Sequence, residues 1–337
     1  MVRAAIIGLG VQGKKYGEII YKGEIENMDL VGVVARSEEN SDWTEENMPG
    51  VKIYRSCEEL FRNSLDFDAV IITTPHRSHP EIAMTAFEKN KAVLCDKPSG
   101  ISVREVEKMN KIAEGIPFAM MFNNRVQPVY KWIKEVLEKN EIGTIKRVLF
   151  ESSKNFRTQH YHNSSGWRST WEGEGGGALI NQGQHLLDLW CWYFGMPERV
   201  ISKVCCGKYN DFDVDDEATL VMEYKDKSGV FIISTGEPMG QDKIEIVGTE
   251  GRIIAEGNNV KLWKYENSVE YMRKAQINNG DNIKGSVEEL YFSPEKRPYH
   301  IMLKNFADYV EGRAEPVARG EEGIYPLKIC KMAYGIK

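Results

Sequence analysis

The sequence has few cysteines and no long apolar run. Six cysteines occur in 337 residues, and none forms a C-x-x-C pair, so neither a disulfide framework nor a metal site is indicated. No apolar run approaches about 18 residues, which argues against a membrane-spanning helix. The N-terminus lacks the apolar core and cleavage site of a signal peptide. We therefore expect free thiols in a reducing cytoplasm and no membrane partner.

The sequence also has fewer basic than acidic residues. The 44 Lys and Arg residues are outnumbered by 50 Asp and Glu, which gives a formal net charge of -6. Binding to nucleic acid or to anionic membranes depends on basic patches, so this balance argues against both partners. The remaining composition is ordinary for a globular protein, and the length suggests about two domains.

In the first third of the chain, short apolar runs alternate with amphipathic segments. We expect strands at Arg3–Leu9, Leu30–Ala35, Ala69–Thr74, Ala92–Cys95 and Phe118–Phe122. Strands that alternate with helices indicate βαβ units and a parallel sheet. The fold class is therefore α/β, and residues 1–122 are predicted to form a Rossmann domain with a doubly wound parallel sheet.

The pattern changes near Asn123. Helices are expected at Val129–Lys139, Ala178–Phe194 and His300–Glu311, and short strands separated by hairpin turns begin after Arg199. Residues 123–337 are thus predicted to form a substrate-binding and oligomerisation domain of the α+β type, with an open, mostly antiparallel sheet.

A G-x-G-x-x-G motif joins the first expected strand to the first helix. Gly8 allows the tight turn, Gly10 lets the backbone approach a pyrophosphate, and Gly13 lets helix and strand pack closely. The helix N-terminus supplies N–H groups and a partial positive charge. This turn, with Val11 and Gln12, is predicted to bind a dinucleotide.

The end of the second strand carries no acidic residue that would bind the 2′-hydroxyl of NAD. Instead Arg36 and Ser37 stand there, where a guanidinium and a hydroxyl suit a 2′-phosphate. The cofactor is therefore NAD(P), with NADP favoured. The alternative that Arg36 stacks on adenine in an NAD site stays open.

Three further motifs follow in order: a T-P-x-x-x-H turn at residues 74–79, a D-K-P turn at 96–98, and a G-G-G…G-x-H-x-x-D segment at 175–188. With the glycine fingerprint, this set resembles the Gfo/Idh/MocA family of sugar and polyol oxidoreductases over nearly the whole chain. The resemblance implies hydride transfer between nicotinamide and a hydroxyl or carbonyl carbon of a cyclic sugar or sugar derivative. It adds these residues to the cofactor site: Thr73, Thr74, Pro75, His76, His79, Asp96 and Lys97.

The resemblance also implies catalytic roles. Lys97 matches the lysine near the nicotinamide and the reacting carbon, and His185 matches the usual acid/base. Asn181 stands where the family commonly has Asp, and an amide cannot take a proton, so its role is limited to hydrogen bonding. In the expected helix, Asn181, His185 and Asp188 are spaced to share one face. A histidine that titrates near working pH and a lysine near a developing oxyanion suit alcohol oxidation.

The substrate is expected to meet an aromatic, polar stretch. Residues 156–171 are too polar for a core helix and long for a connector, so we interpret them as a loop over the substrate site. Tyr161, Trp167, Arg168 and Arg125 are candidate substrate residues beside Asn181 and His185. Ordinary packing is an equally open reading for Trp167 and Arg168.

Two other functions remain open. Some relatives of this family bind a dinucleotide and act as non-catalytic regulators, and Asn181 leaves room for such a sugar sensor. The third possibility is a glycosidase assisted by transient oxidation. The resemblance further implies a homodimer or homotetramer formed through the open sheet, and a somewhat longer C-terminus than this chain has.

Overall fold

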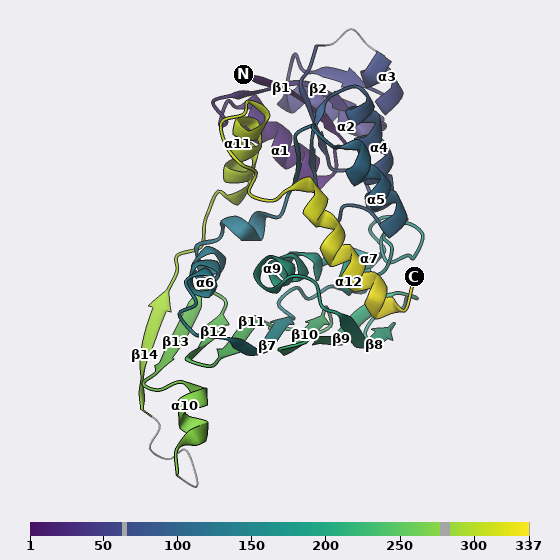
Figure 1. Cartoon of the computed structure of the whole chain (residues 1–337). Helices are drawn as coiled ribbons and strands as arrows, with labels where there is room; N and C mark the ends of the chain where they lie inside the picture. The colour runs from purple at the N-terminus through teal and green to yellow at the C-terminus, as the bar shows by residue number, and fades with distance from the viewer. Residues whose placement is uncertain (63–65, 277–283, 337) are drawn as a thin grey trace. The chain divides into compact units, whose positions relative to one another are not determined.

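The computed structural model describes residues 1–62, 66–276 and 284–336, which form two compact units (Figure 1). Unit 1 comprises Met1–Val126, Glu172–Gly175 and Arg297–Lys328. Unit 2 comprises Gln127–Trp171, Gly176–Lys296 and Ile329–Lys337. No helix in the described ranges is long and apolar enough to cross a membrane. Within the same ranges, no group of three or more His, Cys, Asp or Glu side chains is arranged to hold a metal.

Unit 1 contains a sheet of six parallel strands in the order β3-β2-β1-β4-β5-β6, so the predicted doubly wound sheet is confirmed. Its central strands are continuous apolar runs because helices cover both faces of such a sheet. The strands are β1 (Val2–Ile7), β2 (Met28–Val34), β3 (Lys52–Tyr54), β4 (Ala69–Ile72), β5 (Ala92–Cys95) and β6 (Phe118–Met120).

Most helices of unit 1 alternate with its strands along the chain, and one comes from much later in the sequence. They are α1 (Val11–Tyr21), α2 (Glu38–Asn47), α3 (Cys57–Arg62), α4 (His79–Glu88), α5 (Val103–Ile112) and α11 (Pro298–Val310). Single 3₁₀ turns occur at η1 (His76–Ser78), η2 (Asn123–Val126) and η3 (Gly320–Gly323). Helix α12 (Ile324–Tyr334) begins in unit 1 and ends in unit 2.

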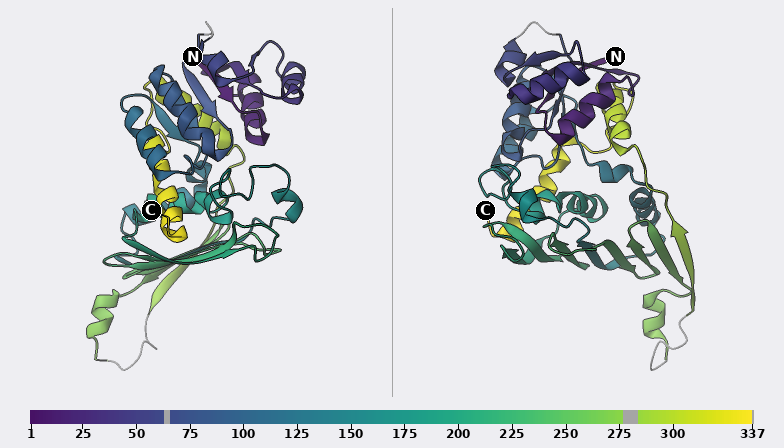
Figure 2. Two further views of the ribbon diagram at one scale, coloured as in Figure 1. Left: turned by 90° about the vertical axis from the view of Figure 1, so that its right-hand side faces the viewer. Right: turned by 180° about the vertical axis from the view of Figure 1, so that it is seen from behind.

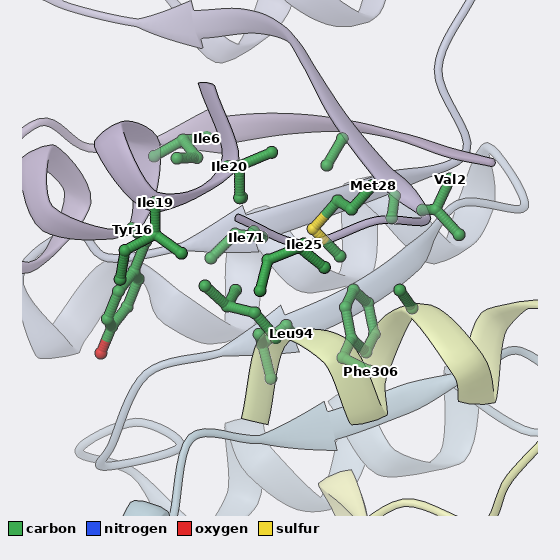
Figure 3. Packing of buried hydrophobic residues seen from close by; sticks show 14 of the residues in the cluster. Val2, Ile6, Tyr16, Ile19, Ile20, Ile25, Met28, Ile71, Leu94 and Phe306 are labelled. Atoms are coloured by element: carbon green, nitrogen blue, oxygen red, sulfur yellow. The ribbon is translucent and has the colours of Figure 1, made fainter. Parts of the chain in front are cut away.

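Helix α11 comes from late in the sequence and completes the core of unit 1. Figure 3 shows Phe306 beside Ile25 and Leu94, beneath a layer that includes Ile6 and Met28. Phe306 is 1% exposed. Truncating a buried phenylalanine typically costs about 3–5 kcal/mol, so this late helix is a substantial part of the unit's stability.

Unit 2 contains an eight-stranded sheet in the order β14-β13-β12-β11-β7-β10-β9-β8. Among the described strand pairs of this sheet, only β7 and β10 are parallel, which confirms the open, mostly antiparallel sheet. The strands are β7 (Ile145–Ser152), β8 (Arg199–Cys206), β9 (Asp215–Glu223), β10 (Ser228–Ser234), β11 (Asp242–Gly248), β12 (Gly251–Glu256), β13 (Asn259–Tyr265) and β14 (Gly285–Tyr291).

Helices α6 (Pro128–Glu138) and α9 (Gln184–Phe194) lie on one face of this sheet, as Figures 1 and 2 both show. Trp190 of α9 is fully buried and packs its ring against Phe150 and Phe231. A Cβ on Gly229 would lie 2.2 Å from the Trp190 ring, so this glycine makes room for it. Trp190 is therefore a core residue of unit 2. The remaining helices of the unit are α7 (Gln159–His162), α8 (Ala178–Asn181) and α10 (Val269–Lys274).

Candidate active site

The glycine-rich turn between β1 and α1 is closed on the side of the sheet. Gly8 has a φ of +101°, and a Cβ there would lie 2.9 Å from the Thr73 carbonyl carbon. A Cβ on Gly13 would come within 1.9 Å of the Gly8 carbonyl oxygen, whereas one on Gly10 would meet no atom of the described residues within 4 Å. The turn therefore has its open side at Gly10.

The N-terminus of α1 fits an anion. Among the described residues, no side chain caps this helix at Gly10, so its first N–H groups keep their partial positive charge. An uncapped helix start beside open space is what a dinucleotide pyrophosphate needs. The predicted residues of this turn, including Val11 and Gln12, thus form a cradle of the right kind for NAD(P).

The segment after β4 braces the glycine turn. The Thr73 hydroxyl donates to the Gly8 carbonyl at 2.5 Å, and the Thr73 N–H donates to the Ile7 carbonyl at 3.0 Å. The Ser78 hydroxyl donates to the Thr74 hydroxyl at 2.8 Å. The order of the strands reverses between β1 and β4, and doubly wound sheets bind ligands at this switch point.

Two histidines hold this segment to other parts of unit 1. The His76 ring lies 3.1 Å from the Glu174 carbonyl. The two ring nitrogens of His79 lie 2.7 Å from the Thr74 carbonyl and 2.8 Å from the Pro98 carbonyl. Burial lowers the pKa of His79, while the two carbonyl contacts act in the opposite direction. These contacts join the T-P turn to the D-K-P turn, so the histidines position the predicted cofactor site.

Lys97 follows β5 and is partly exposed. The neighbouring Asp96 carboxylate accepts the Lys97 backbone N–H at 2.7 Å, and Tyr16 donates to the same carboxylate at 3.4 Å. Burial raises the pKa of Asp96, and the charges of Lys97 and His79 partly offset this. Asp96 thereby fixes the backbone that carries Lys97, at the same edge of the sheet as the glycine turn.

The end of β2 has the positive character that the sequence predicted. Arg36 is exposed and forms no ion pair with any described residue. The Ser37 hydroxyl caps α2 by accepting the Asn40 N–H at 3.3 Å. Arg55, which sequence reasoning missed, contacts the Ser41 hydroxyl at 2.7 Å and the Ser37 carbonyl at 3.4 Å. A second guanidinium therefore stands near Ser37.

In unit 2, the expected single helix over residues 178–194 is wrong. Helix α8 ends at Asn181 and α9 begins at Gln184. The Gly183 N–H donates to the Ala178 carbonyl, five residues back, at 2.9 Å, a π-type interruption that often occurs at functional sites. Only a glycine permits it, because a Cβ on Gly183 would lie 2.4 Å from the Leu179 carbonyl oxygen.

The interruption separates the candidate residues of this segment. Asn181 is buried at the end of α8, whereas His185 is partly exposed and Asp188 is buried on α9. His185 and Asp188 keep their predicted spacing of three residues on one helix. Asn181 takes its position from a different helix.

The start of α8 depends on a carboxylate that sequence reasoning missed. Asp215, the first residue of β9, accepts the N–H groups of Gly177 at 2.8 Å and Leu179 at 2.7 Å. The Tyr334 hydroxyl donates to it at 2.7 Å. Burial raises the pKa of Asp215, and these three donors lower it in part. The sequence signal for this role is the pair Asp215 and Asp216 at the start of an apolar strand.

The candidate substrate residues have different surroundings. Arg125 in unit 1 is 3% exposed, and its guanidinium donates to the Glu322 carboxylate at 2.7 Å and to the Val317 carbonyl at 3.3 Å. These contacts favour a structural role. In unit 2, the expected loop over residues 156–171 includes the short helix α7. There Arg168 donates to the Tyr161 hydroxyl at 2.7 Å and lies over the Trp167 ring.

Comparisons with known proteins agree with the fold and with the glycine turn. Residues 2–119 match the model of the oxidoreductase family with an NAD-binding Rossmann fold, and residues 130–254 match the GFO/IDH/MocA C-terminal domain. The chain is 27% identical to glucose-6-phosphate 3-dehydrogenase of Bacillus subtilis (strain 168), over 78% of this chain and 77% of that protein. It is 24% identical to scyllo-inositol 2-dehydrogenase (NADP(+)) IolW of the same organism, over 98% and 92%.

A solved structure has the same fold. The WlbA dehydrogenase from Bordetella pertussis, in complex with NADH and UDP-GlcNAcA, superposes with a TM-score of 0.82 at 20% identity. The match covers 99% of this chain and 95% of that one. The two family models together cover most of the sequence, including the glycine turn and the helices α8 and α9. The chain therefore belongs to the Gfo/Idh/MocA family of NAD(P)-dependent oxidoreductases.

Proposed function

We propose that this protein oxidises or reduces a ring carbon of a cyclic sugar or sugar derivative. One observation carries the proposal: Lys97 follows the end of β5 by two residues, at the same sheet edge as the uncapped glycine turn, in the strand order β1-β4-β5. A positive charge at that edge can stabilise the negative charge that develops on a substrate oxygen beside the bound cofactor. The two relatives named above, dehydrogenases of glucose 6-phosphate and of scyllo-inositol, support this substrate class.

Each proposed catalytic residue has one task. Bound nicotinamide supplies or accepts the hydride. Lys97 stabilises negative charge on the substrate oxygen, and His185 carries the hydroxyl proton. Asn181 has no ionisable group and hydrogen-bonds the substrate or orients the His185 ring.

We also propose that NADP is the preferred cofactor. Arg36 has no carboxylate partner among the described residues, and Arg55 adds a second positive charge beside Ser37. A 2′-phosphate offers these groups charge-assisted hydrogen bonds that the 2′-hydroxyl of NAD lacks.

The proposal is tested by exchange of labelled hydride between cofactor and a sugar panel. Lys97→Met should lower kcat about 100-fold or more, with dinucleotide affinity nearly unchanged, because the cation acts on developing charge. Lys89→Met, at the exposed end of α4, is the matched control. Unaltered turnover in Lys97→Met would sink the catalytic assignment.

The same assay separates the enzyme from a sugar sensor, the alternative that Asn181 leaves open. A sensor binds dinucleotide and sugar but exchanges no label. A redox-assisted glycosidase would release product without net change in NADH.

We further propose a homo-oligomer in the cytoplasm. Ile201, Val221 and Val230 are cross-strand neighbours in β8, β9 and β10, and the first two are exposed. An apolar row of this kind suits a contact with a second copy. No disulfide joins any of the six cysteines in the described part of the chain, which supports a reducing compartment. Light scattering of the full chain would give the mass of the assembly.

A further inference from the structure

Two arginines of unit 2 share one aromatic ring. The guanidinium carbon of Arg157 lies 4.4 Å from the ring centroid of Tyr161, and that of Arg168 lies 4.8 Å from the same centroid. Arg168 also lies 4.9 Å from the Trp167 ring centroid. Contacts of this kind restrict the positions of both guanidinium groups before any ligand arrives. We call this set the Arg157–Arg168 cluster.

The charge of this cluster is not neutralised by the described part of the chain. Neither arginine forms an ion pair with a described carboxylate, and the Nε atom of each is buried without a hydrogen-bond partner. The Asp216 carboxylate accepts the backbone N–H groups of Lys208, Tyr209 and Asn210, and it forms no ion pair with either arginine within the described ranges. Buried donors left unpaired cost free energy, so the cluster favours an anionic ligand.

Hydrogen bonds connect the cluster to the segment that leads to His185. The Arg157 N–H donates to the Thr235 carbonyl at 2.8 Å, and the Thr235 N–H donates to the Asp216 carbonyl at 2.9 Å. The adjacent Asp215 holds the start of α8. Strands β7 and β10 end at the side of the sheet where β9 begins. The cluster and the start of α8 therefore occupy the same end of the sheet in unit 2.

We propose that Arg157 and Arg168 bind an anionic group of the substrate, a phosphate or a carboxylate carried by the sugar. The inference rests on the proposed function and narrows its substrate class to anionic sugars. A guanidinium presents donors in a fork that matches two oxygens of either group. A neutral sugar offers no charge to these donors.

The test measures binding by calorimetry on the full chain, with glucose 6-phosphate, glucuronate and glucose as probes. The wild type should bind at least one anionic probe more tightly than glucose. Arg157→Gln and Arg168→Gln should each weaken that binding about 10-fold or more, the usual value of a hydrogen bond to a charged group. Binding of glucose should change much less. The probe that responds identifies phosphate or carboxylate as the ligand.

Arg252→Gln is the matched control. Arg252 also lies over an aromatic ring, at 5.3 Å from the Trp263 centroid, but it is paired with Glu245. Its loss should leave anion binding unchanged. Arg157→Lys should recover part of the affinity, because it keeps the charge but not the fork. A thermal-shift series with inorganic phosphate tests the anion site without a sugar, and the double Gln variant should lose the rise in Tm.

Two results would overturn the proposal. In the first, the anionic probes and phosphate bind the Gln variants as tightly as the wild type. In the second, the wild type binds glucose more tightly than both anionic probes. Failure of the proposed function is a separate result. In that case anion binding depends on both arginines, but no label passes between cofactor and any sugar.

Discussion

The two units position their functional segments in different ways. In unit 1, the glycine turn, the T-P turn and the D-K-P turn each follow directly after a parallel strand, so adjacency along the chain places them at one sheet edge. In unit 2, α8 is fixed by Asp215 and Tyr334, which lie 38 and 157 residues beyond Gly177. Sequence motifs thus predict the position of a functional segment well where the segment directly follows a strand. They predict it much less well where distant side chains hold the segment in place.

The largest expected effect comes from adding a side chain at two of the closely packed glycine positions. A Cβ would lie 1.9 Å from a backbone oxygen at both Gly13 and Gly177, so Gly13→Ala and Gly177→Ala should each destabilise the fold by roughly 1–3 kcal/mol. Urea unfolding measures the loss. Gly10→Ala, where a Cβ meets no atom of the described residues within 4 Å, is the control: it should unfold like wild type and still bind dinucleotide more weakly. Equal stability of all three variants would contradict the close packing of these turns.

Asp215→Asn should have an effect no larger than these, and one that is confined to unit 2. An amide has one acceptor oxygen, so one of the N–H groups at the start of α8 is left unpaired, at a cost of about 1–3 kcal/mol. Turnover should fall with α8 displaced, whereas dinucleotide affinity, a property of unit 1, should persist. Asp213→Asn, an exposed neighbour, is the control. A matching loss of dinucleotide affinity would break the contrast between the units.

The same variant gives a pH dependence of known sign. Burial raises the folded-state pKa of Asp215 above its unfolded value, so the folded protein binds this proton more tightly. The carboxyl group therefore stabilises the fold least above its raised pKa. The stability difference between wild type and Asp215→Asn should narrow as pH rises from about 4 through that pKa. Urea titrations across this range would show a widening difference if the sign were wrong.

The smallest expected effect concerns cofactor choice. Arg36→Ala should weaken NADP binding about 10-fold and leave NAD binding nearly unchanged. The variant loses the guanidinium that we expect to bind the 2′-phosphate, and NAD does not carry this phosphate. Fluorescence titration with both cofactors measures this, with Arg104→Ala on α5 as the control. A parallel loss for NAD would favour the alternative, in which Arg36 stacks on adenine.

Much of the fold followed from the sequence. The apolar strands of unit 1 were predicted within a few residues, and hairpins of unit 2 were expected after Arg199, because both patterns are local. Strand β14 was missed since its side chains are mostly exposed and carry no apolar alternation. The interruption between α8 and α9 was missed because residues 178–194 keep an apolar helical pattern through Gly183.

For the site, the predictable part was the set of turns. The fingerprint and the D-K-P turn have spacings that belong to strand ends, so their positions followed from the βαβ pattern. Arg125 was assigned to the substrate because a lone arginine after a polar pair gives no sign of a distant partner, here Glu322. The domain boundary at residue 123 remains a prediction. In the structure, unit 1 also contains two later segments, Glu172–Gly175 and Arg297–Lys328.

The late position of α11 has a consequence for synthesis on the ribosome. The strands of unit 1 leave the exit tunnel first, but Phe306 and the rest of α11 follow only after most of unit 2 has been translated. At typical bacterial and eukaryotic rates this delay lasts on the order of tens of seconds. During that interval the face of the sheet that α11 will cover is exposed, so the nascent chain is a natural client for chaperones that shield apolar surfaces.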